Sequence, residues 1–256
     1  MIDIHCHVLP GIDDGAKDEA DAIAMAQQAV NSGISTVIAT PHHKNRTYEN
    51  EKSFIQKDVL RLNQLFEESN IPLDVLAGQE VRIFGEIVED FEKGEIQTLN
   101  DSKYLLLEFP SDSVPQYAEQ LIFDIQRAGM TPVIAHPERN RDLYTDPNRL
   151  YELISQGALA QLTSGSLSGV FGKEINQVSH QMLEHNLVHF IASDAHNVDT
   201  RNFETLKEAY DVIKQSYGAI IQYSLEENAQ YLIHNENINQ NEPMRIQKKK
   251  KFFGLF

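Results

Sequence analysis

The feature that most constrains the fold is a series of seven short apolar segments at nearly regular intervals. They end near residues 7, 42, 80, 108, 136, 162 and 194, so successive ends lie 26 to 38 residues apart. Each step is about the length of one strand–helix unit of ~30 residues. Seven such units, with strands that are almost continuously apolar, predict an α/β fold with parallel strands in a closed or nearly closed barrel.

Helical periodicity fills the intervals between these segments. The expected helix Glu19–Asn31 begins after Asp18, a residue suited to cap a helix N-terminus, and ends before Gly33. The other helices are expected at residues 51–69, 85–95, 115–128, 146–156, 174–185, 202–217 and 225–234. The predicted globular domain therefore spans residues 1–234.

Acidic and histidine side chains mark six of the seven segment ends, and in α/β barrels the chemistry lies at the C-terminal ends of the strands. In the first segment Ile2, Ile4 and Cys6 alternate with the polar residues, which puts His5 and His7 on one face. The candidate metal ligands are His5, His7, Asp14, His42, Glu80, Glu108, His136, Asp194 and His196.

A mixture of imidazole and carboxylate ligands without thiolate suits manganese, iron or zinc. Nine ligands are too many for one ion, so the sequence predicts a multinuclear site. Cys6 is expected to face away from His5 and His7, and Ile12 stands where a Cys-x5-Arg phosphatase pattern needs arginine. Water activated by metal is therefore the expected nucleophile, rather than a thiol.

Seven motifs occur in a specific order along the chain. They are His5-Cys6-His7, Asp13-Asp14-Gly15, Pro41-His42, Gly78-Gln79-Glu80, Glu108-Phe109, Ala135-His136-Pro137-Glu138-Arg139 and Ser193-Asp194-Ala195-His196. As an ordered set they resemble the polymerase-and-histidinol-phosphatase (PHP) superfamily. Within it, they are similar to the manganese-dependent tyrosine-protein phosphatases of Gram-positive capsule and exopolysaccharide operons.

The resemblance implies a distorted seven-stranded barrel that holds three metal ions. It assigns His5, His7, Glu80 and Asp194 to the first ion. It assigns Asp14, His42 and His196 to the second ion, and Glu80, Glu108 and His136 to the third, with Glu80 as a bridge. Many members of the superfamily have histidine where Asp14 stands, and aspartate is typical of the capsule branch.

Charge favours a phosphomonoester as the substrate. The four carboxylates among the candidate ligands carry four negative charges against six positive charges on three divalent ions, which leaves a charge of +2 to match a phosphate dianion. Arg139 and Arg201 follow ligand-bearing segments, and guanidinium groups suit bidentate contact with phosphate. Thr163, Ser164 and Ser166 could add hydroxyl contacts. The inferred mechanism is in-line attack by a metal-bridging hydroxide on phosphorus, with metals and arginines stabilising the developing charge.

Composition sets further bounds on the protein. Residues 245–256 contain five basic and no acidic side chains, so removing their charge from the total of −16 leaves −21 on residues 1–244. Such a body would repel nucleic acid. The chain has a single cysteine, no apolar run near the ~20 residues of a membrane span, and a strand directly after Met1, from which we expect a cytoplasmic protein.

The composition changes after residue 234. Asparagines dominate the next stretch, and residues 235–256 are predicted to be a polar, disordered linker followed by a basic and aromatic tail. The tail, residues 245–256, is either merely solvated or a weak contact for an anionic membrane surface or an acidic partner.

Several functions remain open from sequence. The favoured one is dephosphorylation of tyrosine on a bacterial tyrosine kinase that regulates capsular or exopolysaccharide synthesis. Histidinol phosphate or another small phosphomonoester is the nearest alternative substrate, and a nuclease is disfavoured by the acidic body. A regulator that docks on the kinase without catalysis is the alternative from another class. The remaining histidines, His43, His180, His185, His189 and His234, are expected to be structural or surface residues.

Overall fold

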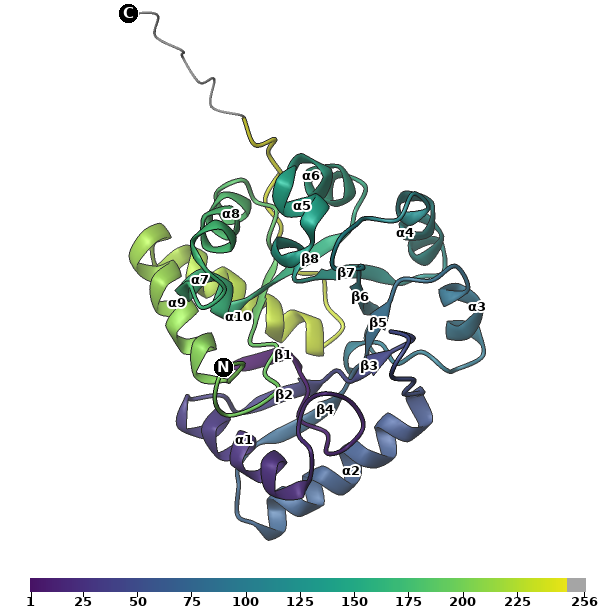
Figure 1. Cartoon of the computed structure of the whole chain (residues 1–256), viewed down its shortest axis with the longest axis vertical. Coiled ribbons are helices and arrows are strands. Elements are labelled where there is room, and N and C mark those ends of the chain that lie inside the picture. Colours follow the sequence, from purple (N-terminus) through teal and green to yellow (C-terminus); the bar gives the residue numbers. More distant parts are fainter. Residues whose placement is uncertain (248–256) are drawn as a thin grey trace, which may run out of the picture.

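The computed structural model describes residues 1–247 and forms parallel strands surrounded by helices (Figure 1). The strands are β1 (Ile2–Cys6), β2 (Thr36–Ala39), β3 (His42–His43), β4 (Asp74–Ala77), β5 (Glu80–Arg82), β6 (Tyr104–Glu108), β7 (Thr131–Ala135), β8 (Leu159–Thr163) and β9 (Phe190–Ala192). The prediction of an α/β fold with parallel strands is confirmed.

Within the described residues the strands form two sheets rather than one closed seven-stranded ladder. One sheet has the order β1-β2-β4 and the other the order β3-β5-β6-β7-β8-β9. The two segments expected near residues 35–42 and 73–80 are each divided, because Pro41 has no N–H group for a ladder and the chain bends at Gly78–Gln79. Backbone contacts still link the sheets. The Glu80 N–H donates to the Pro41 carbonyl (3.1 Å), and around the bridge between Cys6 and Ala195 the Asp194 N–H donates to the His5 carbonyl (2.9 Å) and the His7 N–H to the Ala195 carbonyl (2.8 Å).

Strand β1 departs from simple alternation. Its register against β2 shifts between Asp3 and Cys6, and all five of its residues are buried. Cys6 packs with the residues that face the surrounding helices, whereas Ile2 and Ile4 pack in a second cluster between the strands and the last helix. A bulge of this kind re-aims the following side chains, and it lies directly before His7.

Ten α-helices are present in the described part of the chain, two of them short helices that the periodicity did not predict, α5 and α7. The helices are α1 (Glu19–Asn31), α2 (Lys52–Glu68), α3 (Ile87–Glu92), α4 (Ala118–Arg127), α5 (Arg141–Thr145), α6 (Asn148–Ser155), α7 (Ser164–Ser168), α8 (Lys173–Glu184), α9 (Glu204–Tyr217) and α10 (Ala219–Ile233). The predicted cap is confirmed, since Asp18 accepts a hydrogen bond from the Asp21 N–H (2.9 Å). None of these helices is long and apolar enough to cross a membrane.

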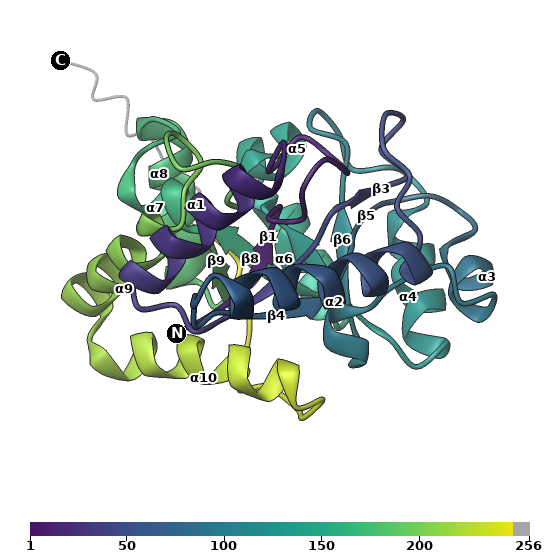
Figure 2. The ribbon, with the colours of Figure 1, turned by 90° about the horizontal axis from the view of Figure 1, so that it is seen from below.

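Helix α10 lies on one side of the strands and the loops that follow β1 and β3 lie on the opposite side (Figure 2). Ala229 and Leu232 of α10 pack with Ile4 and Phe190 in the cluster between the strands. The other layer packs the strands against helices such as α1, α2, α4 and α9. This arrangement leaves the C-terminal strand ends accessible on the side opposite α10.

Residues 235–247 differ from the disordered linker that their composition predicts. The Tyr104 hydroxyl donates to the Glu236 carbonyl (2.6 Å), the Asn239 N–H donates to Asn228 Oδ1 (2.8 Å), and Ile238 is buried. Asparagine side chains and backbone groups satisfy each other here, which gives an apparently structureless sequence a fixed path along the body. The rest of the predicted tail, residues 248–256, lies outside the described residues.

The bend between β4 and β5 requires glycine, and we expect Gly78→Ala to destabilise the protein. A Cβ atom at Gly78 would lie 2.6 Å from Ile38 Cγ2 and 3.0 Å from the nearest side-chain atoms of Leu99 and Thr40. Overpacking of this kind costs about 1–3 kcal/mol. Gly85→Ala is the matched control, since nothing lies within 4 Å of its Cβ position. Urea unfolding should separate the two variants, and equal free energies of unfolding would contradict the packing argument.

Candidate metal centre

The nine predicted ligands come together at the C-terminal strand ends, and four of them share one centre. His5 Nε2 and His7 Nε2 are 3.3 Å apart, and Glu80 Oε2 lies 3.5 Å and 3.4 Å from these two atoms. Asp194 Oδ1 lies 3.4 Å from each of the same nitrogens. Two ligands held ~2.1 Å from one ion are roughly 3.0–3.4 Å apart. These four side chains therefore have the spacing of ligands that share an ion.

The remaining candidates extend this centre on both sides of His42. Asp14 Oδ1 lies 3.4 Å from His42 Nε2 and 3.4 Å from His196 Nε2. His136 Nε2 lies 2.7 Å from Glu80 Oε1. His42 also forms a compact group with Glu80 and Glu108, so it faces two parts of the centre, whereas the resemblance gives it to the second ion alone.

The backbone at two of these positions is unusual. His136 has φ 33° and Asp194 has φ 54°, a left-handed conformation that is rare for residues other than glycine. His136 directly follows β7, and Asp194 lies two residues after the end of β9. Such strained residues concentrate at functional sites, where surrounding contacts hold them.

Gly15 allows the loop after β1 to close over His7. A Cβ atom there would lie 2.0 Å from the His7 carbonyl oxygen and 2.5 Å from its Cβ. The closed loop places Asp13 Oδ2 2.6 Å from His7 Nδ1. On the other side of the centre Gln161 Oε1 lies 2.9 Å from His5 Nδ1. These contacts fix the ring orientations and leave each Nε2 directed at the centre.

Sequence reasoning did not assign these two orienting roles. Asp13 is part of a quoted motif, but its contact with His7 depends on how tightly the loop closes. Gln161 lies within β8 and carries no charge, and only its alternation with Leu162 and Ala160 could have indicated an inward side chain.

The two glutamates at the centre have opposite pKa shifts. Burial acts to raise the pKa of Glu80, but the charges of His42 and His5 and a hydrogen bond with His136 bring it well below its usual range. Burial, together with the charge on Glu80, raises the pKa of Glu108 to about 7. Two carboxylates this close compete for the available positive charge, which a bound cation would supply.

Two histidines are tuned toward the neutral form that binds metals. Burial and the nearby Arg139 charge lower the pKa of His136 to about 4, and burial and His7 lower the pKa of His196 to about 4. Five polar atoms of the centre are buried without a hydrogen-bond partner, namely His42 Nδ1, Glu80 Oε2, Glu108 Oε2, Asp194 Oδ1 and His196 Nε2. Buried polar atoms are rarely left in this state. The residues present therefore fit a metal centre.

Both predicted arginines border the centre. Arg139 Nη2 and Arg201 Nη2 lie 2.5 Å and 2.7 Å from Asp194 Oδ2. They line a cavity of about 270 Å³ together with His42, Glu108 and His136. The Nε atom of each arginine is buried without a hydrogen-bond partner, and both side chains line the cavity, where their positive charge would attract an anion.

Arg82 is a third cation at the centre, which sequence reasoning missed. Its Nε lies 3.2 Å from Glu108 Oε2, and its Nη1 donates to the Phe109 carbonyl (2.9 Å). It stands two residues after Glu80, on the short strand β5. The division of the expected strand at Gly78–Gln79 extends pairing past Glu80 and so brings Arg82 beside Glu108.

The predicted hydroxyl contacts with phosphate are wrong for Ser164 and Ser166. Both are buried, and Ser164 Oγ bonds with Thr205 Oγ1 (2.6 Å) while Ser166 Oγ donates to Glu138 Oε1 (2.7 Å). The chain turns into α7 directly after β8, which directs these side chains into the body. Thr163 is also buried, and its hydroxyl has no partner, so its contact remains a prediction.

Cys6 is unsuited to act as a nucleophile. It is fully buried, donates toward the Ile38 carbonyl (3.5 Å), and burial raises the pKa of its thiol well above the ordinary value. The five histidines outside the pattern belong to none of the candidate metal groups in residues 1–247. His189, for example, is buried and accepts a hydrogen bond from the Ala160 N–H (3.1 Å).

Comparison with known proteins places this chain among the capsule proteins. Residues 1–234 match the family described as "Capsular polysaccharide synthesis, CpsB/CapC". The chain belongs to this family. The tyrosine-protein phosphatase YwqE of Bacillus subtilis is 52% identical over 256 residues, which is 100% of both chains. The tyrosine-protein phosphatase CpsB of Streptococcus pneumoniae is 34% identical over 86% of this chain and 92% of its own.

Solved structures agree with these relatives. A crystal structure from a study of YwqE and CpsB, described as "unique metal-dependent tyrosine phosphatases", superposes with a TM-score of 0.94 at 51% identity and covers 97% of this chain and 100% of its own. An organophosphorus hydrolase mutant from Deinococcus radiodurans superposes with a TM-score of 0.57 at 14% identity and covers 90% of this chain and 92% of its own. The second likeness concerns the fold alone.

If the strand ends hold metal, ligand substitutions should lower metal content. We expect His136→Ala and Asp194→Asn to bind fewer ions than the unaltered protein while remaining folded. Asp13→Asn should weaken binding by about 10–100-fold, because it loosens His7. Inductively coupled plasma mass spectrometry and calorimetric titration with Mn²⁺ would measure both effects.

Two variants serve as controls for this experiment. His234→Ala removes an exposed histidine outside the centre, and Cys6→Ser removes the thiol beside it. Both should keep the full metal content. Unchanged binding in His136→Ala and Asp194→Asn would contradict the site.

Proposed function

We propose that this chain is a metal-dependent tyrosine-protein phosphatase, a phosphoric monoester hydrolase. The observation that carries the proposal is that Asp194 contacts both the candidate metal ligands and the two arginines. One carboxylate oxygen faces the His5 and His7 nitrogens, and the other holds the guanidinium groups of Arg139 and Arg201. A phosphate dianion bound beside the arginines would lie next to the metal ligands. The family membership and the names of the relatives support the same activity.

Manganese is the proposed metal, in a three-ion site within a distorted seven-stranded barrel, with iron or zinc as alternatives. His5, His7, Glu80 and Asp194 would hold the first ion, Asp14, His42 and His196 the second, and Glu80, Glu108 and His136 the third. When bound, such ions lower the pKa of a coordinated water and offset negative charge on phosphorus oxygens.

The protein's own side chains bind and orient the substrate. Arg139 and Arg201 would donate to the phosphate oxygens, and their shared contact with Asp194 fixes both guanidinium groups before the substrate arrives. The guanidinium carbon of Arg139 lies 5.4 Å from the centre of the Phe171 ring, which supports it on one side. Arg82 holds Glu108, which lines the same cavity, in place.

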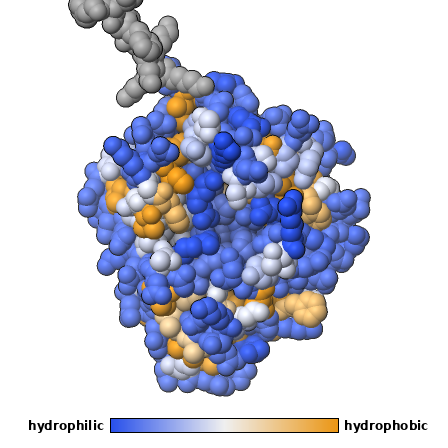
Figure 3. All heavy atoms as spheres, viewed as in Figure 1, coloured by the Kyte–Doolittle hydropathy of each residue, from blue (hydrophilic) through white to orange (hydrophobic). Residues whose placement is uncertain are grey.

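The proposed substrate is phosphotyrosine on a tyrosine kinase that acts in capsular or exopolysaccharide synthesis, within the cytoplasm. The family description supports the pathway. The surface around the strand ends is mostly hydrophilic at its centre, which suits a phosphorylated protein segment (Figure 3). The acidic body, with −21 on residues 1–244, disfavours nucleic acid as a substrate.

A substrate panel tests this function directly. The manganese-loaded protein would be given a phosphotyrosine peptide, the matched phosphoserine peptide and histidinol phosphate, with Asp194→Asn as the inactive control. We expect the phosphotyrosine peptide to have the highest kcat/KM. A preference for histidinol phosphate would replace the proposal with a small-molecule phosphatase, and binding of phosphorylated kinase without turnover would indicate a docking regulator.

We expect Arg139→Ala and Arg201→Ala to lower kcat/KM without emptying the metal centre. Loss of a charge-assisted contact costs about 1.5–3 kcal/mol, which corresponds to roughly 10–150-fold in rate. Arg139→Lys should recover only part of the loss, because an ammonium group cannot make a bidentate contact. Arg61→Ala is the control, since Arg61 forms an exposed pair with Glu19. Near-normal kinetics with both arginines replaced would exclude a phosphate-binding role.

A further inference from the structure

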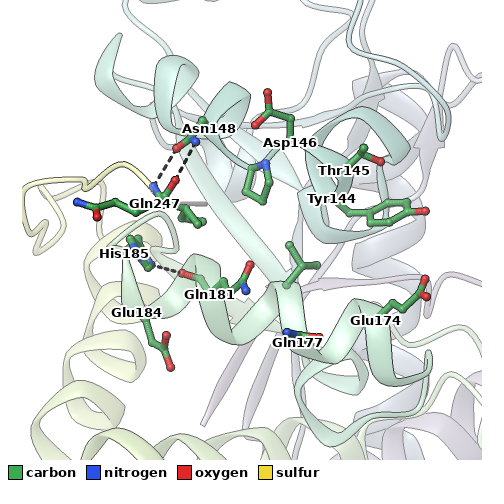
Figure 4. Close-up of a pocket in the computed structure, with 13 residues that line it drawn as sticks. Tyr144, Thr145, Asp146, Asn148, Glu174, Gln177, Gln181, Glu184, His185 and Gln247 are labelled. Carbon is green, nitrogen blue, oxygen red and sulfur yellow. Dashed lines mark hydrogen bonds between the residues drawn. The ribbon is translucent and has the colours of Figure 1, made fainter. Parts of the chain in front are cut away.

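A groove separate from the metal centre lies between α5–α6 and α8 (Figure 4). Its volume is about 620 Å³, larger than that of the cavity beside the arginines. Acidic side chains from both walls line it, namely Asp146, Glu174 and Glu184. Apolar contact surface comes from Tyr144, Pro147 and Val178. The groove therefore combines negative charge with apolar surface.

The acidic side chains of the groove are not neutralised by the nearby arginines. Arg149 pairs with Asp142 (2.5 Å) and Arg245 lies 3.5 Å from Glu152, neither of which lines the groove. Within residues 1–247 no Lys or Arg forms an ion pair with Asp146, Glu174 or Glu184. The groove is thus lined by three acidic side chains without a Lys or Arg partner in the described chain, of which Glu184 points away from the α5–α6 wall (Figure 4).

The end of the described chain enters this groove. The Met244 N–H donates to the His185 carbonyl at the C-terminal end of α8 (2.8 Å). Two residues later the Asn148 side chain pairs with the backbone of Ile246, donating to its carbonyl (3.0 Å) and accepting from its N–H (2.8 Å). This double contact mimics one step of strand pairing and holds the chain at the edge of the groove, where Gln247 lines it (Figure 4).

The basic terminal segment is already bound to the body at its first cation. The Arg245 guanidinium carbon lies 4.6 Å from the centre of the Tyr151 ring on α6, and Glu152 is its carboxylate neighbour. A cation held over an aromatic face and beside a carboxylate is a stabilising arrangement. The body therefore recognises this segment by charge and aromatic contact before the chain reaches Lys248.

We propose that the groove between α5–α6 and α8 is the docking site for the chain's own last nine residues, Lys248–Phe256. Their four lysines complement the three acidic side chains, and their three phenylalanines and one leucine complement the apolar surface. Nine extended residues reach ~30 Å, whereas the twelve residues of α8 span ~18 Å. The segment is therefore long enough to pass along α8 from His185 to Glu174.

Docking would compete with any contact between the same residues and an anionic membrane. A lysine that pairs with Glu174 or Glu184 is unavailable to lipid headgroups, so each interaction weakens the other. The proposal needs no assumption about the reaction at the metal centre, and the groove residues take no part in that centre.

Disulfide trapping tests the contact in the full chain. Gln177, which lines the groove from an exposed position on α8, and Phe253 would each be replaced by cysteine; Cys6, the only native cysteine, is buried. The control pair joins Phe253→Cys to Glu68→Cys, an exposed position at the end of α2. Under mild oxidation we expect the groove pair to crosslink within one chain at least tenfold faster than the control pair.

Neutralising the groove separates docking from simple tethering. Asp146→Asn, Glu174→Gln and Glu184→Gln together should slow crosslinking of the groove pair several-fold and increase sedimentation with phosphatidylserine vesicles. Hydrolysis of a soluble aryl phosphate should stay unchanged and would show that the variants are folded.

Three outcomes would overturn the proposal. Equal crosslinking rates in the groove and control pairs would mean that the segment has no preferred site on the body. Crosslinks formed only between two chains would make a second copy the occupant. Vesicle binding that is strong and indifferent to the groove substitutions would assign the segment to the membrane instead.

Discussion

The carboxylate of Asp194 is the group on which both halves of the candidate site depend. It is buried, and an unpaired buried charge would be very unfavourable. Its charged partners offset this unfavourable free energy. Burial alone would raise the pKa of Asp194, but the charges of Arg139, His5 and Arg201 hold that pKa well below the ordinary value. Because one side chain serves both the imidazole nitrogens and the guanidinium groups, an ion at the first position and an anion beside the arginines are coupled through a single carboxylate.

The same reasoning explains why so many acidic side chains are tolerated at the strand ends. Glu80 and Glu108 are both buried, and the pKa of Glu108 near 7 reflects burial and the charge of its neighbour. Arg82 and His42, whose pKa is raised against the effect of burial by the charge and hydrogen bond of Glu80, offset part of this charge within the protein. Bound cations would offset the rest, so folding and metal binding are linked: ions that bind only the folded state stabilise it.

The ligands could be predicted from sequence because parallel strands bring their C-terminal ends to one edge. Regular spacing and the residue types at those ends were sufficient for all nine candidates to be found close together. The bend at Gly78, the bulge in β1 and the turn into α7 could not be predicted, because each depends on contacts between distant segments. These local departures decide the positions of Arg82 and Ser166 and the closure of Asp13 on His7. Composition likewise failed for residues 235–247, whose backbone groups pair with the side chains of Asn148 on α6 and Asn228 on α10.

The candidate metal ligands and the two arginines beside them lie on different kinds of segment. Most of the ligands lie in or directly after buried strands, where the backbone is fixed by pairing, whereas Asp14, Arg139 and Arg201 lie on the segments that follow β1, β7 and β9. A distant hydrolase with 14% identity shares the fold, so the fold alone does not determine the substrate. The arginines act as a pair only because Asp194, in its left-handed conformation, directs one oxygen toward them. Recognition of an anion is therefore built on the strained residue that also faces the metal ligands, so a change at Asp194 itself would alter both properties, whereas a change at either arginine would alter anion recognition alone.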